Sequence, residues 1–265
     1  MDYVIGISWP RSGHHMLVRL FQLYFGSDFH YCDFYGNDET CCRTVPCQKA
    51  GQINFTKNHD FALDVPQISG QKYLIQYRDF LPSVVSNYEL FVRQGGEDSR
   101  RSFCKFASTE FGRYRAFIRK WVTSEFGQQQ LILNYTDFLS DPEGHLARAI
   151  SFLGDPKRLS LTTLRDVIEQ VDGEKIQQHK VQKLTNSGVH AGRDVTSFRY
   201  YDKDLFTRLK AMVLTREEVN NLFSTYLDRE AAEDNMVQLQ AFETTEALKQ
   251  FILNSPEYAA KVQGI

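Results

Sequence analysis

Apolar residues recur along the chain in two alternating patterns. Three short runs, rich in β-branched and aromatic residues, predict buried parallel strands: YVIGIS at 3–8, KYLIQYR at 72–78 and QLILNY at 130–135. Longer segments with apolar residues at helical spacing follow these runs, at 15–25, 82–94, 99–126 and 141–154. Strands that alternate with helices predict an α/β fold of three layers, in which helices flank both faces of a parallel sheet.

Two regions depart from this alternation. From about Asp28 to Pro66 there is little periodicity, and Cys, Asn, Asp, Gly and Pro are scattered through the segment. We therefore expect a long irregular connection with a functional role there. Beyond Gly154 the chain is helical or irregular, and its acidic tail predicts further helices. We expect a main domain at 1–215 and a helical C-terminal appendage at 216–265, which either stands apart or packs on the main domain.

Composition limits the class of protein. The chain has 265 residues, of which 42% are hydrophobic and 24% charged, so it can fill the core of a globular protein. A formal net charge of -2 gives no general attraction to nucleic acid or to an anionic membrane, and any anion site must be local. There is no apolar run of about 20 residues and no evident signal peptide. We expect a cytoplasmic protein of undetermined oligomeric state, with neither nucleic acid nor membrane as a partner.

Four of the five cysteines fall close together: Cys32, Cys41, Cys42 and Cys47, with Cys104 apart. Their spacing lacks the paired CxxC of structural zinc sites. In a cytosolic chain such cysteines are more often free thiols than disulfides. We expect reduced thiols and predict no metal ligands. A metal site that includes the nearby His30 and a regulatory disulfide are the two alternatives.

The segment SWPRSGHH (8–15) connects the first predicted strand to the first predicted helix. Pro10 cannot donate a backbone hydrogen bond, so sheet pairing ends there. Free backbone N–H groups at the start of a helix bind anions, and Gly13 lets a phosphate approach the backbone closely. Arg11 adds a charged donor. The Gly-Lys-Ser/Thr sequence of a Walker A loop is missing. The alternative is an ordinary strand-to-helix turn.

This segment resembles the 5′-phosphosulfate loop of the sulfotransferases that use 3′-phosphoadenosine 5′-phosphosulfate (PAPS). In that family the pattern is Pro-Lys/Arg-Ser/Thr-Gly-Thr/Ser-Thr, and here His14 and His15 replace the hydroxyl residues. Their backbone N–H groups can still bind the anion, which disfavours a metal role for the histidine pair. The resemblance implies a P-loop-like sulfotransferase fold, PAPS as donor and 3′-phosphoadenosine 5′-phosphate as product. It also implies a set of loop residues that bind the cofactor: Arg11, Ser12, Gly13, His14 and His15, of which Arg11 also stabilises the developing charge.

Three further segments carry the resemblance. Arg78 at a strand end and Ser86 eight residues later are similar to the Arg and Ser that bind the 3′-phosphate in the family. A structural pairing of Arg78 with Asp79 or with a neighbouring helix is the alternative. Tyr135 stands at the position that lies near the adenine in the family. In NSGVHAGRDVTSFRYY, Arg193 is the candidate phosphate contact in a late loop that otherwise matches the family poorly.

The segment NFTKNHDF contains the candidate general base. In cytosolic family members a Lys-Thr-His stands about twenty residues before the 3′-phosphate Arg, and here His59 precedes Arg78 by 19 residues. Histidine suits the role because its reference pKa of ~6.5 leaves it mostly neutral at pH 7. The resemblance implies that His59 accepts the acceptor's proton and that Lys57 holds the sulfuryl oxygens.

The acceptor is less constrained by the sequence. The irregular connection should form its pocket, and we expect His30, Asp33 and Asp60 to contact it. Acids beside aromatic residues favour a small polar acceptor, either a sugar or a natural product of the saxitoxin type, with transfer to a hydroxyl or a nitrogen. The resemblance is closer to bacterial tailoring or carbohydrate sulfotransferases than to the enzymes that act on phenols and steroids. Two other classes remain as alternatives: a P-loop-type nucleotide kinase and a non-catalytic nucleotide-binding module.

Overall fold

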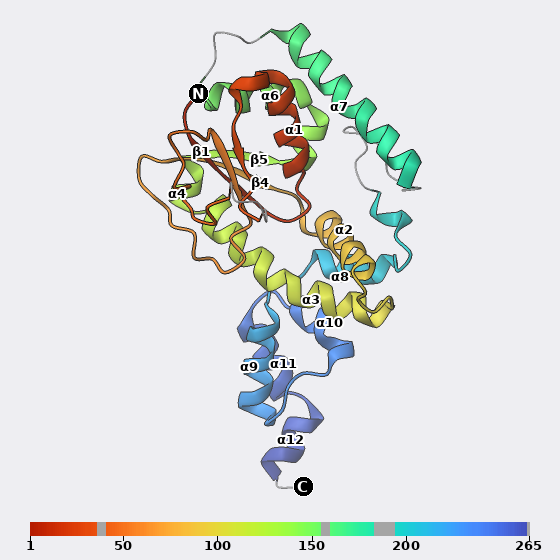
Figure 1. Cartoon of the computed structure of the whole chain (residues 1–265). Coiled ribbons are helices and arrows are strands. Elements are labelled where there is room, and N and C mark those ends of the chain that lie inside the picture. The colour runs from red at the N-terminus through yellow and green to blue at the C-terminus, as the bar shows by residue number, and fades with distance from the viewer. Residues whose placement is uncertain (36–40, 155–159, 183–193, 264–265) are drawn as a thin grey trace. The chain divides into compact units, whose positions relative to one another are not determined.

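The computed structural model describes residues 1–35, 41–154, 160–182 and 194–263. The chain forms two compact units, each built from two stretches of sequence. We call Met1–Asp79 with Phe117–Arg193 the sheet unit, and Phe80–Ala116 with Asp194–Ile265 the helical unit. Figure 1 labels many of their elements.

The sheet unit is built on a parallel sheet. In the described residues it has five strands in the order β2-β3-β1-β4-β5. Their bounds are β1 Val4–Ser8, β2 Tyr31–Cys32, β3 Phe55–Asn58, β4 Lys72–Tyr77 and β5 Leu131–Asn134. In the centre, Ile7 pairs with Asn58 of β3 and Ser8 pairs with Gln76 of β4. The predicted α/β fold with a parallel sheet is confirmed.

Two strands of this sheet were not predicted. β2 and β3 lie within the segment that we expected to be an irregular connection. β3 reads FTKN, and β2 has two residues, so neither has the apolar run of a buried strand. β3 is nevertheless buried along its length, because it lies between β1 and β2. Its polar side chains are therefore held in the interior at one end of the sheet.

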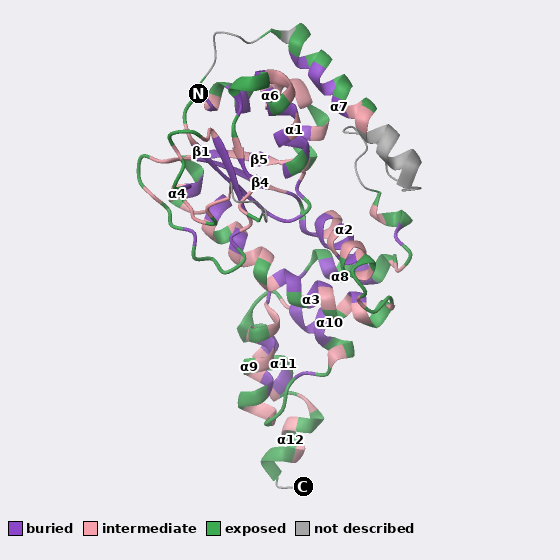
Figure 2. Cartoon of the chain, viewed as in Figure 1, coloured by how far each residue is buried: buried purple, intermediate pink, exposed green. Residues whose placement is uncertain are grey.

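Helices cover both faces of the sheet, as predicted. The helical segments of this unit are α1 His14–Phe25, η1 Gly26–Asp28, the π-helical η2 Ile118–Val122, α4 Glu125–Gln128, α5 Tyr135–Ser140, α6 Pro142–Phe152 and α7 Leu161–Gln182. One face packs residues of α1, α6 and α7 against Phe55 and Leu74. On the other face Tyr73 packs against Trp121 and Phe126, with ring centroids 5.5 and 5.2 Å apart. Figure 2 shows the strands buried between these layers.

The helical unit has its own core. Its helical segments are α2 Phe80–Arg93, α3 Arg100–Phe117, whose last residue belongs to the sheet unit, η4 Val195–Ser197, α8 Lys203–Lys210, α9 Arg216–Leu227, η5 Glu233–Asn235, α10 Met236–Gln240, α11 Thr245–Leu253 and α12 Pro256–Gln263. Apolar side chains of α2, α3, α8 and α10 form one cluster, and those of α9, α10 and α11 form another. None of the helices in the described part of the chain combines the length and apolar character that crossing a bilayer requires.

The tail packs closely on part of this unit. Arg115 of α3 forms a 2.6 Å ion pair with Glu218 of α9, and the buried Gln240 side chain donates to the backbone carbonyl of Ser108. The compact units therefore do not separate at the predicted 215/216 boundary. Residues 216–263 form a compact unit with segment 80–116, because their helices share apolar clusters and polar contacts with it. A functional boundary at that position stays a prediction.

Candidate active site

The candidate site residues of the sheet unit follow the carboxyl ends of its strands. The loop that contains Arg11 and Gly13 follows β1, and Lys57 is the next-to-last residue of β3. Arg78 follows β4 and Tyr135 follows β5. Because all pairs are parallel, these strand ends meet at one edge of the sheet, where ligands of open α/β sheets bind.

The loop after β1 has the geometry of an anion cradle. Arg11 and Gly13 both have left-handed backbone angles, with φ of 65° and 86°. Gly13 precedes α1 without a side-chain cap, so the first N–H groups of the helix are not taken by a capping side chain. The Ser12 hydroxyl oxygen is buried and has no hydrogen-bond partner among the described residues. Such a buried hydroxyl is what a bound phosphate group would satisfy.

Gly13 also touches a second predicted site residue. A Cβ atom at this position would lie 2.4 Å from the ring of Tyr135, so only glycine fits. The guanidinium carbon of the buried Arg78 lies 4.8 Å from the centre of the same ring. Burial raises the pKa of Tyr135, although Arg78 and Arg11 oppose the shift. The Tyr135 ring thus holds the loop and Arg78 together, and three predicted motifs meet there.

His59 is held in an orientation that suits a base. Its Nδ1 lies 2.6 Å from the backbone carbonyl oxygen of Ser8, which accepts only if Nδ1 carries the proton. The lone pair is then on Nε2. Burial lowers the pKa of His59 to about 4, so the ring is neutral at pH 7. The rings of Tyr35 and Phe61 lie against it, each with its centroid 5.2 Å away.

Lys57 lies in a buried polar network beside this base. Its ammonium is 3.2 Å from Nε2 of His15 and 3.8 Å from a carboxylate oxygen of Asp33. Lys57 is only 6% exposed, and burial lowers its pKa while Asp33 raises it. Burial and the Lys57 charge also lower the pKa of His15. Neutral His15 accepts a hydrogen bond from Lys57, so the second histidine of the loop positions this lysine.

The His14 side chain has a different environment from His15. Its ring is buried, stacks on Phe55 with centroids 5.7 Å apart, and places Nε2 3.1 Å from the Tyr31 hydroxyl. Burial lowers its pKa well below the usual value, with Lys57 adding to the effect. Because the imidazole packs against the sheet, the backbone N–H of His14 is the group best suited to the anion cradle.

The three predicted acceptor residues have different environments. Asp33 lies beside Lys57, as described above. His30 precedes Tyr31, which pairs with the first residue of β3. His30 therefore lies at the amino-terminal end of these strands, whereas Lys57 lies near their carboxyl end. Asp60 is buried, and its carboxylate accepts hydrogen bonds from Lys120, Trp121 and the backbone N–H of Val65. Asp60 therefore holds the loop, and neither it nor His30 is placed to contact an acceptor at this edge.

The sheet unit, as far as the structure describes it, does not include two of the predicted cofactor residues, Ser86 and Arg193. Ser86 is buried in α2 of the helical unit, which begins two residues after Arg78. Its role in binding the 3′-phosphate stays a prediction. Arg193 lies outside the described residues, so the expected phosphate contact is untested.

Tyr35 has a role at the site that the sequence did not reveal, although it was one of the aromatic residues expected near the acceptor. Its hydroxyl accepts a 2.8 Å hydrogen bond from the backbone N–H of His59, and its ring lies 5.5 Å from the Lys57 ammonium. Tyr35 thus contacts both the candidate base and the candidate sulfuryl-binding lysine. The only sequence signal was a tyrosine in an acidic, aromatic segment, which does not specify a contact 24 residues away along the chain.

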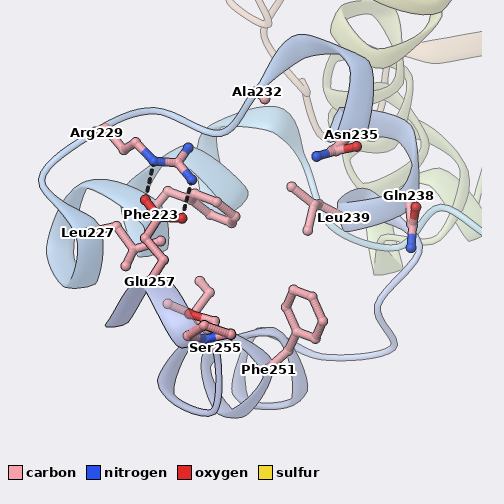
Figure 3. A pocket seen from close by; sticks show the side chains of 12 residues that line it. Phe223, Leu227, Arg229, Ala232, Asn235, Gln238, Leu239, Phe251, Ser255 and Glu257 are labelled. Carbon is pink, nitrogen blue, oxygen red and sulfur yellow. Dashed lines mark hydrogen bonds and ion pairs between the residues drawn. The ribbon is translucent and has the colours of Figure 1, made fainter. Parts of the chain in front are cut away.

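The helical unit contains a cavity of about 500 Å³ near the C-terminus. Figure 3 shows it between α9, α10, α11 and α12, with an ion pair between Arg229 and Glu257 on one side. Phe223, Leu239 and Phe251 contribute much of its apolar lining. None of the predicted site residues lines this cavity.

The comparison with protein families gives one match. The family model described as "Sulfotransferase domain" matches residues 66–210, which is more than half of the chain. The matched segment includes Arg78, Ser86 and Tyr135. The β1 loop, Lys57 and His59 precede it, so their assignment depends on the geometry described above. A comparison with curated proteins finds no match.

Proposed function

The chain belongs to the sulfotransferase domain family and is a sulfotransferase; from this we propose that it transfers a sulfuryl group from PAPS to a hydroxyl or nitrogen of a small polar acceptor. The observation that carries the proposal is the position of His59. The carbonyl of Ser8, at the end of the strand that leads into the anion cradle, holds Nδ1 and leaves Nε2 to accept a proton. Sulfotransferases of this family generally use PAPS.

The residues at the sheet edge suit this donor. The N–H groups at the start of α1, the Ser12 hydroxyl and Arg11 would hold the 5′-phosphosulfate. Arg78 would bind the 3′-phosphate through its planar set of donors, with Ser86 and Arg193 as further contacts. The Tyr135 ring touches Gly13 and lies beside the Arg78 guanidinium, and it would contact the nucleotide. When bound, PAPS supplies a sulfuryl group on a phosphate leaving group.

Three residues of the sheet unit would perform the transfer. His59 accepts the acceptor's proton at Nε2 while the acceptor atom bonds to sulfur. The 5′-phosphate would be the leaving group of the same displacement, and its oxygen would keep the electron pair of the bond to sulfur. Arg11 stabilises the charge that develops on that oxygen, and Lys57 holds the sulfuryl oxygens. Positioning and charge stabilisation are the main requirements of such a transfer, by analogy with phosphoryl transfer.

The acceptor would bind beside His59. Tyr35 and Phe61 are 40% and 60% exposed, and both rings lie against the imidazole. Asp33 provides a half-exposed carboxylate close by. An aromatic surface next to an acid favours a flat or ring-shaped polar molecule with a positive charge or several hydroxyls. A guanidinium-containing natural product of the saxitoxin type and a sugar are the two acceptors to test.

Calorimetric titration with 3′-phosphoadenosine 5′-phosphate tests the donor. We expect binding that weakens at least about 100-fold in Arg78→Ala, because a charged contact to phosphate is lost, and that is unchanged in Arg148→Ala on α6. No binding of the bisphosphate, with tight binding of ATP and Mg²⁺ instead, would favour a nucleotide kinase.

Turnover of PAPS with a panel of sugars and guanidinium compounds tests the base. His59→Ala should lower kcat about 100- to 10,000-fold and leave bisphosphate affinity unchanged. His145→Ala, on α6, is the matched control and should keep full activity. Equal activity of the His59 and His145 variants would exclude the assigned base.

A further inference from the structure

Four cysteines of the segment between β1 and β4 come together in the sheet unit. The sulfur atoms of Cys32, Cys42 and Cys47 all lie within 4.8 Å of one another. The Cys42 and Cys47 sulfurs are 3.4 Å apart, and the Cys41 sulfur is 4.0 Å from that of Cys32. Cys32 and Cys47 are buried, and the other two are half-buried. The proposed reaction uses none of these thiols.

We propose that Cys32, Cys41, Cys42 and Cys47 bind one structural Zn²⁺ ion. Four thiolates at the usual Zn–S distance of about 2.3 Å form a tetrahedron with edges of about 3.8 Å. The Cys42–Cys47 and Cys32–Cys41 sulfur pairs, at 3.4 and 4.0 Å, lie on either side of this value. Cys41 is outside the group of three sulfurs that lie within 4.8 Å of one another, so its side chain would turn toward Cys42 and Cys47 to complete the tetrahedron. An all-thiolate tetrahedral site favours zinc over magnesium or calcium, which prefer oxygen ligands.

Hydrogen-bond donors surround two of the proposed ligands. The Thr44 hydroxyl donates to the Cys42 sulfur at 3.1 Å. The backbone N–H of Gln48 also donates to Cys42, and that of Lys49 donates to Cys47. Donors of this kind spread the negative charge of metal-bound thiolates and orient the ligands. Each thiol releases its proton on binding, so four thiols and one Zn²⁺ give a complex with two net negative charges.

A disulfide explains less of this arrangement. Cys42 and Cys47 are close enough to form one after a small movement, but a disulfide joins two sulfurs at about 2.05 Å. It would leave the Cys32 thiol buried beside it and Cys41 without a function. Zinc would use all four sulfurs and would join Cys32, at the end of β2, to Cys41, Cys42 and Cys47 further along the chain.

The zinc site would also position acceptor residues. Asp33 follows Cys32 directly, and Tyr35 is two residues further on. Asp33 contacts Lys57, and Tyr35 contacts His59. A closed coordination shell near these residues would therefore hold the acceptor side of the site in place without taking part in sulfuryl transfer.

Metal analysis of the full chain, purified without a metal-affinity step or chelator, tests the proposal directly. We expect about one zinc per chain in the wild type and in Cys104→Ser, whose cysteine lies outside the cluster. Cys42→Ser and Cys47→Ser should each lower the zinc content at least about 10-fold. Less than about 0.1 zinc per wild-type chain, without uptake of added Zn²⁺, would overturn the proposal.

Cobalt substitution tests the ligand geometry without relying on variants that fold poorly. Co²⁺ added to the metal-free wild type should give the visible bands of a tetrahedral site and thiolate charge-transfer bands in the near ultraviolet, and Zn²⁺ should displace them. Removal of the metal should lower the thermal midpoint by at least about 5 °C. An octahedral cobalt spectrum, or a Cys42–Cys47 disulfide found by peptide mass spectrometry in the freshly isolated protein, would count against the zinc site. These measurements do not depend on sulfotransferase activity, so they can fail while the proposed function stands.

Discussion

Two lysine–aspartate pairs lie on either side of His59 along the chain, and their environments are opposite. Lys57 and Asp33 are 3.8 Å apart, and the Asp33 side chain is 40% exposed. Lys120 and Asp60 are 2.7 Å apart, and the Asp60 side chain is fully buried. The first pair has a buried cation with a distant, half-exposed anion. The second has a buried anion that its donors surround.

The difference follows from how each charge is satisfied. Asp60 accepts hydrogen bonds from Lys120, from the Trp121 indole and from the backbone N–H of Val65. Lys120 also donates to the carbonyls of Leu63 and Val65, so the pair ties the loop after β3 to the π-helical segment. By contrast, Lys57 donates a hydrogen bond to neutral His15 and has only a long ion pair, of 3.8 Å, with Asp33. Its ammonium can therefore still bind an anion. A charged pair whose hydrogen-bonding groups are all occupied by the protein thus indicates a structural role. A charged pair with unused hydrogen-bonding capacity indicates a ligand site.

Asp60→Asn should have the largest effect on stability. The amide keeps one acceptor but replaces the other with a donor that faces Lys120 and Trp121, so a half-buried cation and a buried indole N–H lose their acceptor. We expect the free energy of unfolding to fall by about 3 kcal/mol, which corresponds to a thermal midpoint lower by about 6–12 °C. Calorimetric unfolding measures this. A midpoint within about 2 °C of the wild type would remove the distinction between the two pairs.

Lys57→Met should change activity and leave stability nearly unchanged. Methionine keeps much of the apolar stem and removes a charge whose burial is costly, so the thermal midpoint should stay within about 2 °C. We expect kcat to fall about 100- to 1000-fold, since a group that stabilises the transition state is lost. The affinity for 3′-phosphoadenosine 5′-phosphate, which lacks the sulfuryl group, should be unchanged. A large loss of stability with normal kcat would assign Lys57 the structural role that we give to Lys120.

Asp33→Asn should have the smallest effect of the three. A half-exposed ion pair at 3.8 Å is worth only about 0–1 kcal/mol. We expect an increase of less than about fivefold in the KM of the acceptor, with unchanged stability and kcat. Steady-state kinetics with the identified acceptor measures this. If Asp33→Asn lowers the thermal midpoint as much as Asp60→Asn, then the exposed fraction of the carboxylate does not separate the two pairs.

Much of the fold was predictable because its signals are local. The three predicted strands and the helix after each of them depend on spacing within short windows, and all are present. Asp141 caps α6 and Pro142 is its first residue, as the Asp-Pro sequence indicated. β2 and β3 were missed because they are short and partly polar, and their burial comes from the strands beside them. The helical unit combines segments that are more than 75 residues apart in the chain, which local patterns do not reveal.

The candidate site, too, was partly predictable from local motifs and partly dependent on tertiary contacts. Gly13, Arg78 and Tyr135 were predicted from motifs, and the structure brings them together. Asp33 and Asp60 looked equivalent in the sequence, as acids in one irregular segment. Only the structure shows that Asp60 has buried donors around it and that Asp33 does not.

By itself, the sequence determined the parallel α/β class, the candidate anion-binding loop and the occurrence of Lys57 and His59 in one segment, because each depends on residues close together in the chain. The tertiary structure decided the protonated nitrogen of His59, the partner of Lys57 and the convergence of the cysteines. Those features require contacts across the sheet, such as that between Ser8 and His59, and contacts between segments that the fold brings together. Strand order and burial determine such contacts, and they depend on the whole core rather than on any local run of residues.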